Sequence, residues 1–176
     1  MTYFSKFPLM IHESNGKETV VKDILRRARF ISEYKPYTDL YTPYRISDGE
    51  TPQSIAHSIY GAATYHWVVM LFNEIHDPYF DWPMSSHTLY DYCVDKYGED
   101  NMYLVRHIEQ DGNIIGEIKE FNKDIPWVAP ENDGNHLAVS FYEYEESVNE
   151  AKRSIHIMKP ELLGDFVSQF GEWISV

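Results

Sequence analysis

The sequence predicts an α+β fold: a central strand–helix–helix–strand module, helical N- and C-terminal extensions and a β-hairpin insertion. Three observations predict it. A turn at 48–50 separates a short strand from apolar residues at helical spacing. Residues 102–108 and 113–119 alternate in polarity around Asp111-Gly112, as the strands of a hairpin do. After Pro160, large apolar residues recur along one stripe of a final helix.

The central module is predicted over 44–83 and begins with a strand of about 44–47. Thr51 follows the turn and can cap a first helix, because its hydroxyl can accept from the free backbone N–H groups there. Gly61 permits a left-handed exit and ends that helix. A second helix is expected over 64–72, and the aromatic block that follows it is expected to hold the returning strand.

The N-terminal region, 1–43, is predicted to be an arm that carries one helix. Residues 1–18 are expected to be irregular, and the apolar spacing over 19–32 predicts a helix. Arg26 and Arg27 lie in a basic cluster that stands out in an acidic chain. Two interpretations stay open for it, a solvated helix face and a docking surface. The Tyr- and Pro-rich stretch that follows is expected to be an extended connector.

The C-terminal region, 84–176, is predicted to be α+β, and residues 122–136 are expected to form a loop. Its predicted elements are a helix from Ser85 or Ser86 to Tyr97, the hairpin, a strand at 137–142, a helix at 143–153, a strand at 154–158 and the final helix. The sequence therefore predicts three regions, 1–43, 44–83 and 84–176.

Composition excludes several classes of function. The formal net charge of −13 argues against a nucleic-acid partner and against docking on anionic lipid, which both require a basic face. The longest apolar run is far shorter than a membrane span, and no signal peptide is expected at the N-terminus. Cys93 is the one cysteine, so neither an intramolecular disulfide nor a cysteine-rich zinc site is expected. We therefore expect folding in a reducing cytoplasm, with Cys93 buried and inert.

No pattern in the sequence predicts catalysis. The eight histidines include no pair at His-Glu-x-x-His spacing, so no metal site is expected. There is no Gly-x-Ser-x-Gly nucleophile motif and no glycine-rich phosphate loop. The acidic run at 143–146 is interpreted as a solvated helix face rather than a glycosidase carboxylate pair. We therefore expect no catalytic residue and no cofactor.

Residues 44–73 resemble a LysM domain. That family has a strand, a Gly-Asp-Thr-like turn, an Ile-Ala pair on the first helix, a Tyr-Gly stop and a second helix that ends in Asn. The matching residues here are Gly49, Thr51, Ile55, Ala56, Tyr60, Gly61 and Asn73. LysM modules bind N-acetylglucosamine polymers, and the resemblance places the sugar groove near 49–53 and 74–80. The block 73–82 is bulkier than an ordinary LysM second strand and is expected to cover that groove.

The run from Ile-Tyr-Gly through Trp-Val-Val-Met-Leu-Phe-Asn to Asp-Pro-Tyr-Phe-Asp-Trp resembles the baseplate wedge protein of T-even-type contractile-tailed bacteriophages. In that family a LysM-like module is embedded in a chain of comparable length. The resemblance covers most of the sequence, strongly over 55–82 and weakly over 100–140. It implies a non-enzymatic structural protein of the virion, present in the tail baseplate and assembled in the host cytoplasm.

The resemblance also implies partners. Six copies would lie around the tail axis, where each clamps adjacent wedges together and contacts other wedge subunits and the sheath-initiator protein. The alternatives are a LysM-type binder of peptidoglycan or chitin and a peptidoglycan-degrading tail enzyme. The candidate interface residues are Tyr37, Tyr41, Tyr79, Phe80, Trp82, Arg26 and Arg27. For Tyr79, Phe80 and Trp82 the competing interpretation is packing within the chain, over the module.

Overall fold

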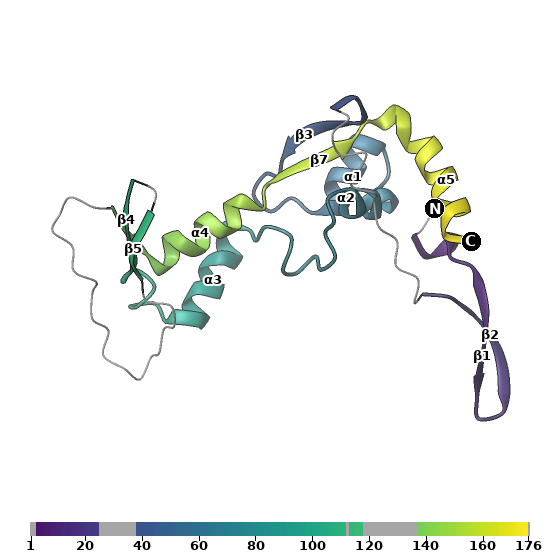
Figure 1. The fold of residues 1–176 in the computed structure, drawn as a ribbon, viewed down its shortest axis with the longest axis horizontal. Coiled ribbons are helices and arrows are strands. Elements are labelled where there is room, and N and C mark those ends of the chain that lie inside the picture. Colours follow the sequence, from purple (N-terminus) through teal and green to yellow (C-terminus); the bar gives the residue numbers. More distant parts are fainter. Residues whose placement is uncertain (1–2, 25–37, 112, 118–136, 176) are drawn as a thin grey trace. The chain divides into compact units, whose positions relative to one another are not determined.

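A computed structural model describes residues 3–24, 38–111, 113–117 and 137–175 (Figure 1). Within these residues the fold is α+β, as predicted, with five α-helices and three small antiparallel sheets. The chain forms two compact units, one of residues 1–82 and 154–176 and one of residues 83–153. None of the described helices has the length and apolar character that a membrane crossing requires.

The centre of the first unit is a two-stranded sheet with two helices (Figure 1). Strand β3 (Tyr41–Arg45) pairs antiparallel with β7 (Ser154–Met158). Between them in sequence come α1 (Pro52–Tyr60), a 3-10 turn (Ala63–Tyr65) and α2 (His66–Phe72), and α2 packs against β7. The strand predicted at 154–158 is confirmed, whereas the strand predicted at 44–47 lies at 41–45 instead.

The prediction that the returning strand directly follows the second helix is wrong. Residues 74–82 form turns and contain no strand. The strand that closes the sheet is β7, so the whole second unit is inserted between α2 and its returning strand. Strand pairing is set by contacts distant in sequence, and the local pattern at 74–82 contains no information about them.

The ends of α1 follow from its sequence. The Thr51 hydroxyl accepts from the Ser54 N–H at 3.1 Å, and the Ser54 hydroxyl accepts from the Thr51 N–H at 2.9 Å. This reciprocal capping box satisfies two of the donors that a helix start leaves free. Gly61 ends the helix with φ of 78°, which lies in the left-handed region that glycine adopts without strain. The predicted cap and stop are therefore confirmed.

Two apolar clusters lie on opposite faces of the β3–β7 sheet. Along β7, Ile155 and Ile157 point to one face of the sheet and Met158 points to the opposite face, because successive side chains of a strand alternate. The first cluster consists of Ile46, Ile55, Ala56, Val69, Trp82, Ile155 and Ile157. The second consists of Phe7, Trp67, Val68, Phe72, Met158, Leu163, Phe170 and Ile174. The second is completed by α5 (Leu163–Ser175), which follows a 3-10 turn at Pro160–Leu162 and confirms the predicted final helix.

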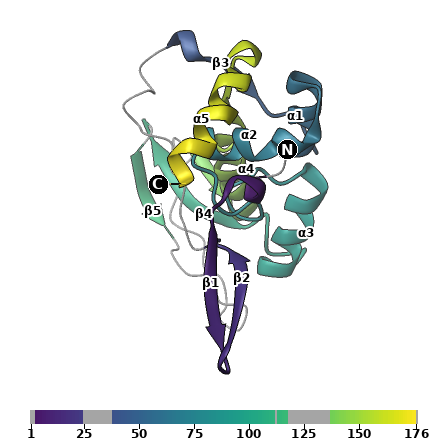
Figure 2. The same cartoon turned by 90° about the vertical axis from the view of Figure 1, so that its right-hand side faces the viewer.

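The N-terminal segment forms a hairpin rather than the predicted irregular stretch and helix. After a 3-10 helix at Tyr3–Lys6, β1 (Leu9–Ser14) pairs with β2 (Lys17–Lys22), as Figures 1 and 2 show. Asn15 and Gly16 connect them with φ of 53° and 71°, the two positive values of a type I′ turn. The helix prediction is wrong for residues 19–22, because β-branched residues beside an Asn-Gly turn favour strands. Residues 25–32 lie outside the described part of the chain.

The second unit combines two helices with a three-stranded sheet. Its elements are α3 (Ser86–Tyr97), β4 (Val105–Gln110), β5 (Asn113–Glu117), β6 (Leu137–Ser140) and α4 (Phe141–Ala151). The strand order is β5-β4-β6, and the core consists of Leu89, Cys93, Tyr97, Met102 and Phe141. The predicted helix cap at Ser85 is confirmed, and so is the hairpin, although its first strand lies at 105–110 rather than at 102–108. The strand predicted at 137–142 ends at Ser140, because Ser140 caps α4. The loop predicted at 122–136 lies outside the described residues.

Candidate interaction site

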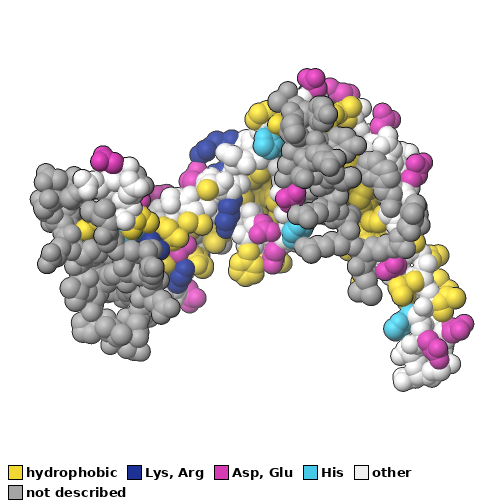
Figure 3. Space-filling model, viewed as in Figure 1, with side chains coloured by type: hydrophobic (Ala, Val, Ile, Leu, Met, Phe, Trp, Pro, Cys, Tyr) yellow, Lys and Arg dark blue, Asp and Glu magenta, His cyan; other side chains and the backbone are white. Residues whose placement is uncertain are grey.

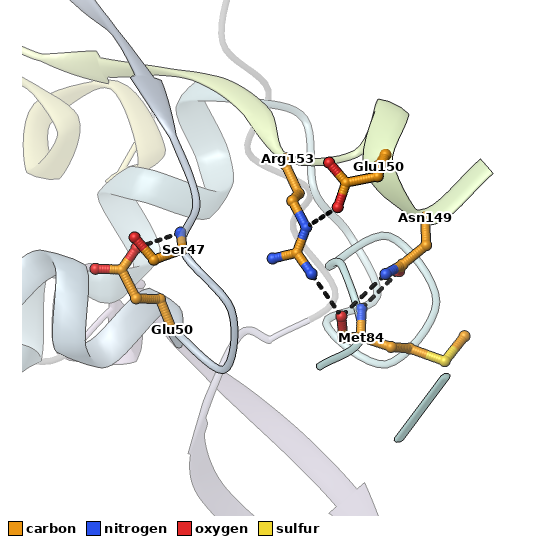
Figure 4. Close-up of polar contacts among 6 residues, drawn as sticks. All are labelled: Ser47, Glu50, Met84, Asn149, Glu150 and Arg153. Atoms are coloured by element: carbon orange, nitrogen blue, oxygen red, sulfur yellow. Dashed lines mark hydrogen bonds and ion pairs between the residues drawn. The ribbon is translucent and has the colours of Figure 1, made fainter. Parts of the chain in front are cut away.

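The turn between β3 and α1 is held by one carboxylate. The Glu50 side chain accepts from the Ser47 N–H at 2.7 Å (Figure 4). It also accepts from the Tyr44 hydroxyl, at 2.9 and 3.1 Å. Burial and this hydrogen bond raise the pKa of Tyr44, so the phenol stays protonated and donates. Gly49 completes the turn with φ of 74°. The turn is therefore a rigid entry to α1.

Trp82 connects the loop after α2 to this turn. Its indole N–H donates to the Glu50 carbonyl at 2.8 Å, and its ring lies in the cluster with Ile46, Ile55 and Val69. Only 7% of Trp82 is exposed. Trp82 was predicted as an interface anchor, and in the free chain its own unit buries the ring and satisfies its donor. This is the packing within the chain that the competing interpretation describes, and a role of Trp82 at an interface stays a prediction.

Tyr79 and Phe80 are exposed, in contrast to the buried Trp82. They are 85% and 74% exposed, although they stand only two or three residues away from it. The Asp77 side chain accepts from the Tyr79 N–H at 2.8 Å, and the Asp77 carbonyl accepts from the Asp81 N–H at 2.8 Å. The Asp81 carboxylate accepts in turn from the backbone N–H groups of His76 and Asp77, both at 3.0 Å. We call residues 77–81, with their two exposed rings, the aromatic turn.

The hydrogen bonds fix the backbone of the aromatic turn at both ends. The turn is anchored on one side by the buried indole of Trp82 and on the other by the hydrogen bond from the Ile75 N–H to the Met70 carbonyl at 2.9 Å. Large apolar rings are ordinarily buried in a folded chain, and their exposure on a fixed backbone is typical of a surface that a partner covers. The aromatic turn is therefore the strongest candidate for an interface in the first unit.

The other residues of the LysM-like motif lie together in the first unit. Ile55 and Ala56 are fully buried against the sheet. The Tyr60 hydroxyl donates to the Met158 carbonyl of β7 at 3.0 Å, and burial raises the pKa of this phenol. Asn73, at the end of α2, donates to the Val69 carbonyl at 2.8 Å and also contacts β7. The motif residues thus lie on α1, beside its two ends or, for Asn73, directly after α2.

The remaining candidate interface residues give a mixed result. Tyr41 is half-buried, and its ring makes an edge contact with His156 at 4.4 Å between centroids and packs against Phe72. Tyr41 therefore packs within the first unit. Arg26, Arg27 and Tyr37 lie outside the described residues.

The second unit contains a buried polar cluster that the sequence did not predict (Figure 4). Asn149 is 3% exposed, and its side chain accepts from the Met84 N–H at 2.7 Å and donates to the Met84 carbonyl at 3.0 Å. Arg153 is 6% exposed, donates to the same carbonyl at 3.2 Å and pairs with Glu150. The cluster fastens the first residues of the unit to the end of α4. A buried Asn and Arg near a helix end have no sequence pattern that distinguishes them from surface residues.

The described residues offer little reactive chemistry. Among them no group of three or more His, Cys, Asp and Glu side chains is placed to hold a metal ion. Cys93 is fully buried, and burial, with a smaller contribution from Glu145, raises the pKa of its thiol to about 11. A thiol with so high a pKa is not a nucleophile at neutral pH. The features that stand out among the described residues are exposed apolar side chains.

Two comparisons with known proteins identify the family of the chain. The family model described as base plate wedge protein 53 matches residues 15–172 of the chain. The baseplate wedge protein gp53 of Enterobacteria phage T4 is 28% identical over 160 residues, which cover 84% of this chain and 76% of that protein. Because the family model spans most of the chain, the protein belongs to the base plate wedge protein 53 family, the non-enzymatic structural proteins of the phage tail baseplate.

Proposed function

We propose that the chain clamps adjacent wedges together in the baseplate, with the aromatic turn as one of its anchors. The observation that carries this proposal is the exposure of Tyr79 and Phe80, 85% and 74%, on a backbone fixed by hydrogen bonds. Buried aromatic anchors supply much of the binding energy of protein interfaces. An anchor that is already ordered in the free chain loses little conformational entropy when it binds.

The scaffold of this anchor is proposed to be a LysM-like module made of β3, α1, α2 and β7. The capping box at Thr51, the left-handed exit at Gly61 and the Asn73 contacts support that assignment. In this module the second unit is an insertion between α2 and β7. The division into an arm (1–43), a module (44–83) and a C-terminal region (84–176) stays a prediction, and the proposed module adds the start of β3 and β7 to its middle region.

The sugar groove of this module is proposed to be filled by the chain itself. A LysM groove would lie between the turn at 49–53 and the loop at 74–80. Here the indole of Trp82 donates to the Glu50 carbonyl of that turn, and its ring lies in the apolar cluster below it. A sugar would have to displace a buried aromatic ring, so the module is better suited to support than to bind glycan.

The proposed partners are other wedge subunits and the sheath-initiator protein, with six copies of the chain around the tail axis. The family membership supports association with baseplate proteins in general. The two exposed rings support a neighbour whose surface presents an apolar pocket, because an aromatic anchor is stabilised by a well-packed, dry cavity.

The test is co-assembly of the full chain with the other wedge proteins of its own phage, co-expressed and separated by size. The double variant Tyr79→Ala/Phe80→Ala is expected to fold with an unchanged melting temperature, because both rings are exposed, and to drop out of the complex. Tyr103→Ala removes a tyrosine that is 60% exposed on the second unit and serves as the matched control. Wild-type recovery of the double variant in the complex would refute the anchor, and binding of chitin oligomers by the wild-type chain would refute the filled groove.

A further inference from the structure

One face of the β1–β2 hairpin is apolar and exposed. The strand register places Leu9 opposite Lys22, Ile11 opposite Val20 and Glu13 opposite Glu18. Alternate residues of a strand share a face, so these three pairs lie on the same side of the hairpin. Leu9, Ile11 and Val20 are 64%, 66% and 64% exposed. Figure 3 shows hydrophobic side chains along the hairpin and acidic ones nearer its tip.

The opposite face of the hairpin has a different character. Met10 lies opposite Val21, and both are half-buried. The pairs beyond them, His12 with Thr19 and Ser14 with Lys17, are polar. The hairpin therefore has one half-covered, largely polar face and one exposed apolar face.

The charge of the exposed face is acidic. The Lys22 ammonium is turned back to the base of the hairpin, where it donates to the Phe7 carbonyl at 2.7 Å and to the Ser5 carbonyl at 3.2 Å. Within the described part of the chain, neither the Glu13 nor the Glu18 carboxylate has a hydrogen bond or ion pair. Like charges directly opposite each other destabilise a strand pair, so the free hairpin bears a repulsion that a cation between the two carboxylates would convert into attraction.

The hairpin also has little support of its own. A two-stranded ribbon in water is marginally stable, and this one contains two strands and no third among the described residues. A partner that covered the apolar face would bury its side chains and so stabilise the hairpin. The opposed glutamates indicate the chemistry of that partner, because an apolar strip alone would leave their repulsion in place.

We infer that the face formed by Leu9, Ile11, Val20, Glu13 and Glu18 is a second docking surface, for a neighbouring protein whose apolar strip ends in an arginine or lysine. This inference rests on the proposed structural role, since it names a further surface by which the chain meets its neighbours. The apolar side chains supply the burial. The glutamates set the register and the salt dependence, because a partner cation at any other position would leave them unpaired.

The test measures the affinity of the full chain for a purified wedge complex assembled without it, at low and at high salt. Glu13→Gln/Glu18→Gln is expected to weaken binding about fivefold at low salt. The difference from wild type should shrink at high salt, because the contribution is electrostatic. The same substitution removes the repulsion, so the melting temperature of the free chain should stay the same or rise. If the glutamine variant binds more weakly but is at least as stable as wild type, its weaker binding does not come from a damaged fold.

Two further variants distinguish the contribution of this face from the effect of changing the hairpin anywhere. Ile11→Thr/Val20→Thr keeps the β-branched shape but not the apolar surface, and is expected to weaken binding about tenfold. His12→Lys/Thr19→Lys places its substitutions on the other face and raises the net charge by the same two units as the glutamine variant. We expect it to bind within about twofold of wild type at both salt concentrations.

The outcomes distinguish this inference from the proposed function. If the glutamine and threonine variants bind like wild type while Tyr79→Ala/Phe80→Ala does not, the hairpin face is refuted and the anchor stands. If His12→Lys/Thr19→Lys weakens binding as much as the glutamine variant, the effect belongs to overall charge and the inference is refuted. If all variants, including the aromatic one, bind like wild type, both proposals are refuted.

Discussion

The Asn73 side chain hydrogen-bonds both backbone groups of His156, 83 residues further along the chain. Its Nδ2 donates to the His156 carbonyl at 2.7 Å, and its Oδ1 accepts from the His156 N–H at 2.8 Å. The amide therefore imitates one more strand beside β7, at the end of α2. This contact joins two parts of the first unit that the inserted second unit separates in sequence.

Replacing Asn73 tests how much this contact stabilises the first unit. Asn73→Ala removes both hydrogen bonds to the His156 backbone together with the one to the Val69 carbonyl, so we expect the free energy of unfolding to fall by about 1–2 kcal/mol. Urea denaturation of the full chain measures the change. Gln53→Ala, at an exposed position of α1, is the matched control and should stay within about 0.5 kcal/mol of wild type. Equal stability of the two variants would show that Asn73 does not hold β7.

Asn149 is expected to matter more, because it is buried. Asn149→Ala leaves the N–H of the half-buried Met84 without its acceptor, and the loss of such a partner costs about 1–3 kcal/mol. Hydrogen exchange at the Met84 amide should accelerate together with a loss of stability in the second unit. Ser147→Ala, two residues away on an exposed part of α4, provides the comparison. Unchanged protection of the Met84 amide would contradict the role given to this cluster.

Glu143 predicts a dependence on acid pH. Its carboxylate accepts from the Ser140 N–H and hydroxyl, both at 2.8 Å, and these hydrogen bonds hold its pKa below the ordinary value of 4.5. A lowered pKa in the folded state stabilises the protein above the ordinary value, and this stabilisation is lost as the pH falls through the folded-state pKa.

The matching variant is Glu143→Gln. It should be less stable than wild type at pH 7 by about 0.5 kcal/mol, a small effect because the carboxylate is exposed to solvent. The difference should disappear well below pH 4.5, where the wild-type carboxyl is also protonated. Denaturation curves at both pH values measure it. A difference that persists unchanged in acid would mean that the charge of Glu143 contributes nothing.

Cys93 predicts a dependence on alkaline pH. Burial raises the pKa of its thiol from the ordinary 9.0 to about 11. Because the folded state holds this proton more tightly than the unfolded state, the contribution is complete below pH 9 and is lost as the pH rises towards 11. At pH 8 a thiol reagent should react with the native chain far more slowly than with the chain in urea. Reaction of the native chain at the unfolded rate would contradict the burial of Cys93.

The sequence predicted those elements whose signals are local. Thr51 and Gly61 bracket α1, Ser85 precedes α3, and Ser154–Met158 alternates as a strand. In each case the hydrogen bonds that define the element's end, or its buried side chains, lie within a few residues. Such features are readable without knowledge of the tertiary structure.

The sequence could not predict features that depend on distant contacts. The pairing of β3 with β7 spans the whole second unit, and the contacts of Asn149 with Met84 span 65 residues. The apolar residues at 19–24 fit helical and strand spacing alike, and the pairing with β1 across the Asn-Gly turn decides between them. The candidate site shows the same limit: Phe80 and Trp82 are two aromatics two residues apart, and only the tertiary packing exposes one and buries the other.

The proposed anchor requires that Tyr79 touches another wedge subunit in the assembled baseplate. The most direct measurement replaces Tyr79 with the photoreactive amino acid p-benzoylphenylalanine in the full chain, assembles the wedge, irradiates it and identifies the cross-linked protein by mass spectrometry. The same replacement at Tyr103 is the control. We predict a cross-link from position 79 to a different wedge protein or to a second copy of this chain. Assembly of an intact wedge in which position 79 cross-links to no other chain would contradict the proposed contact.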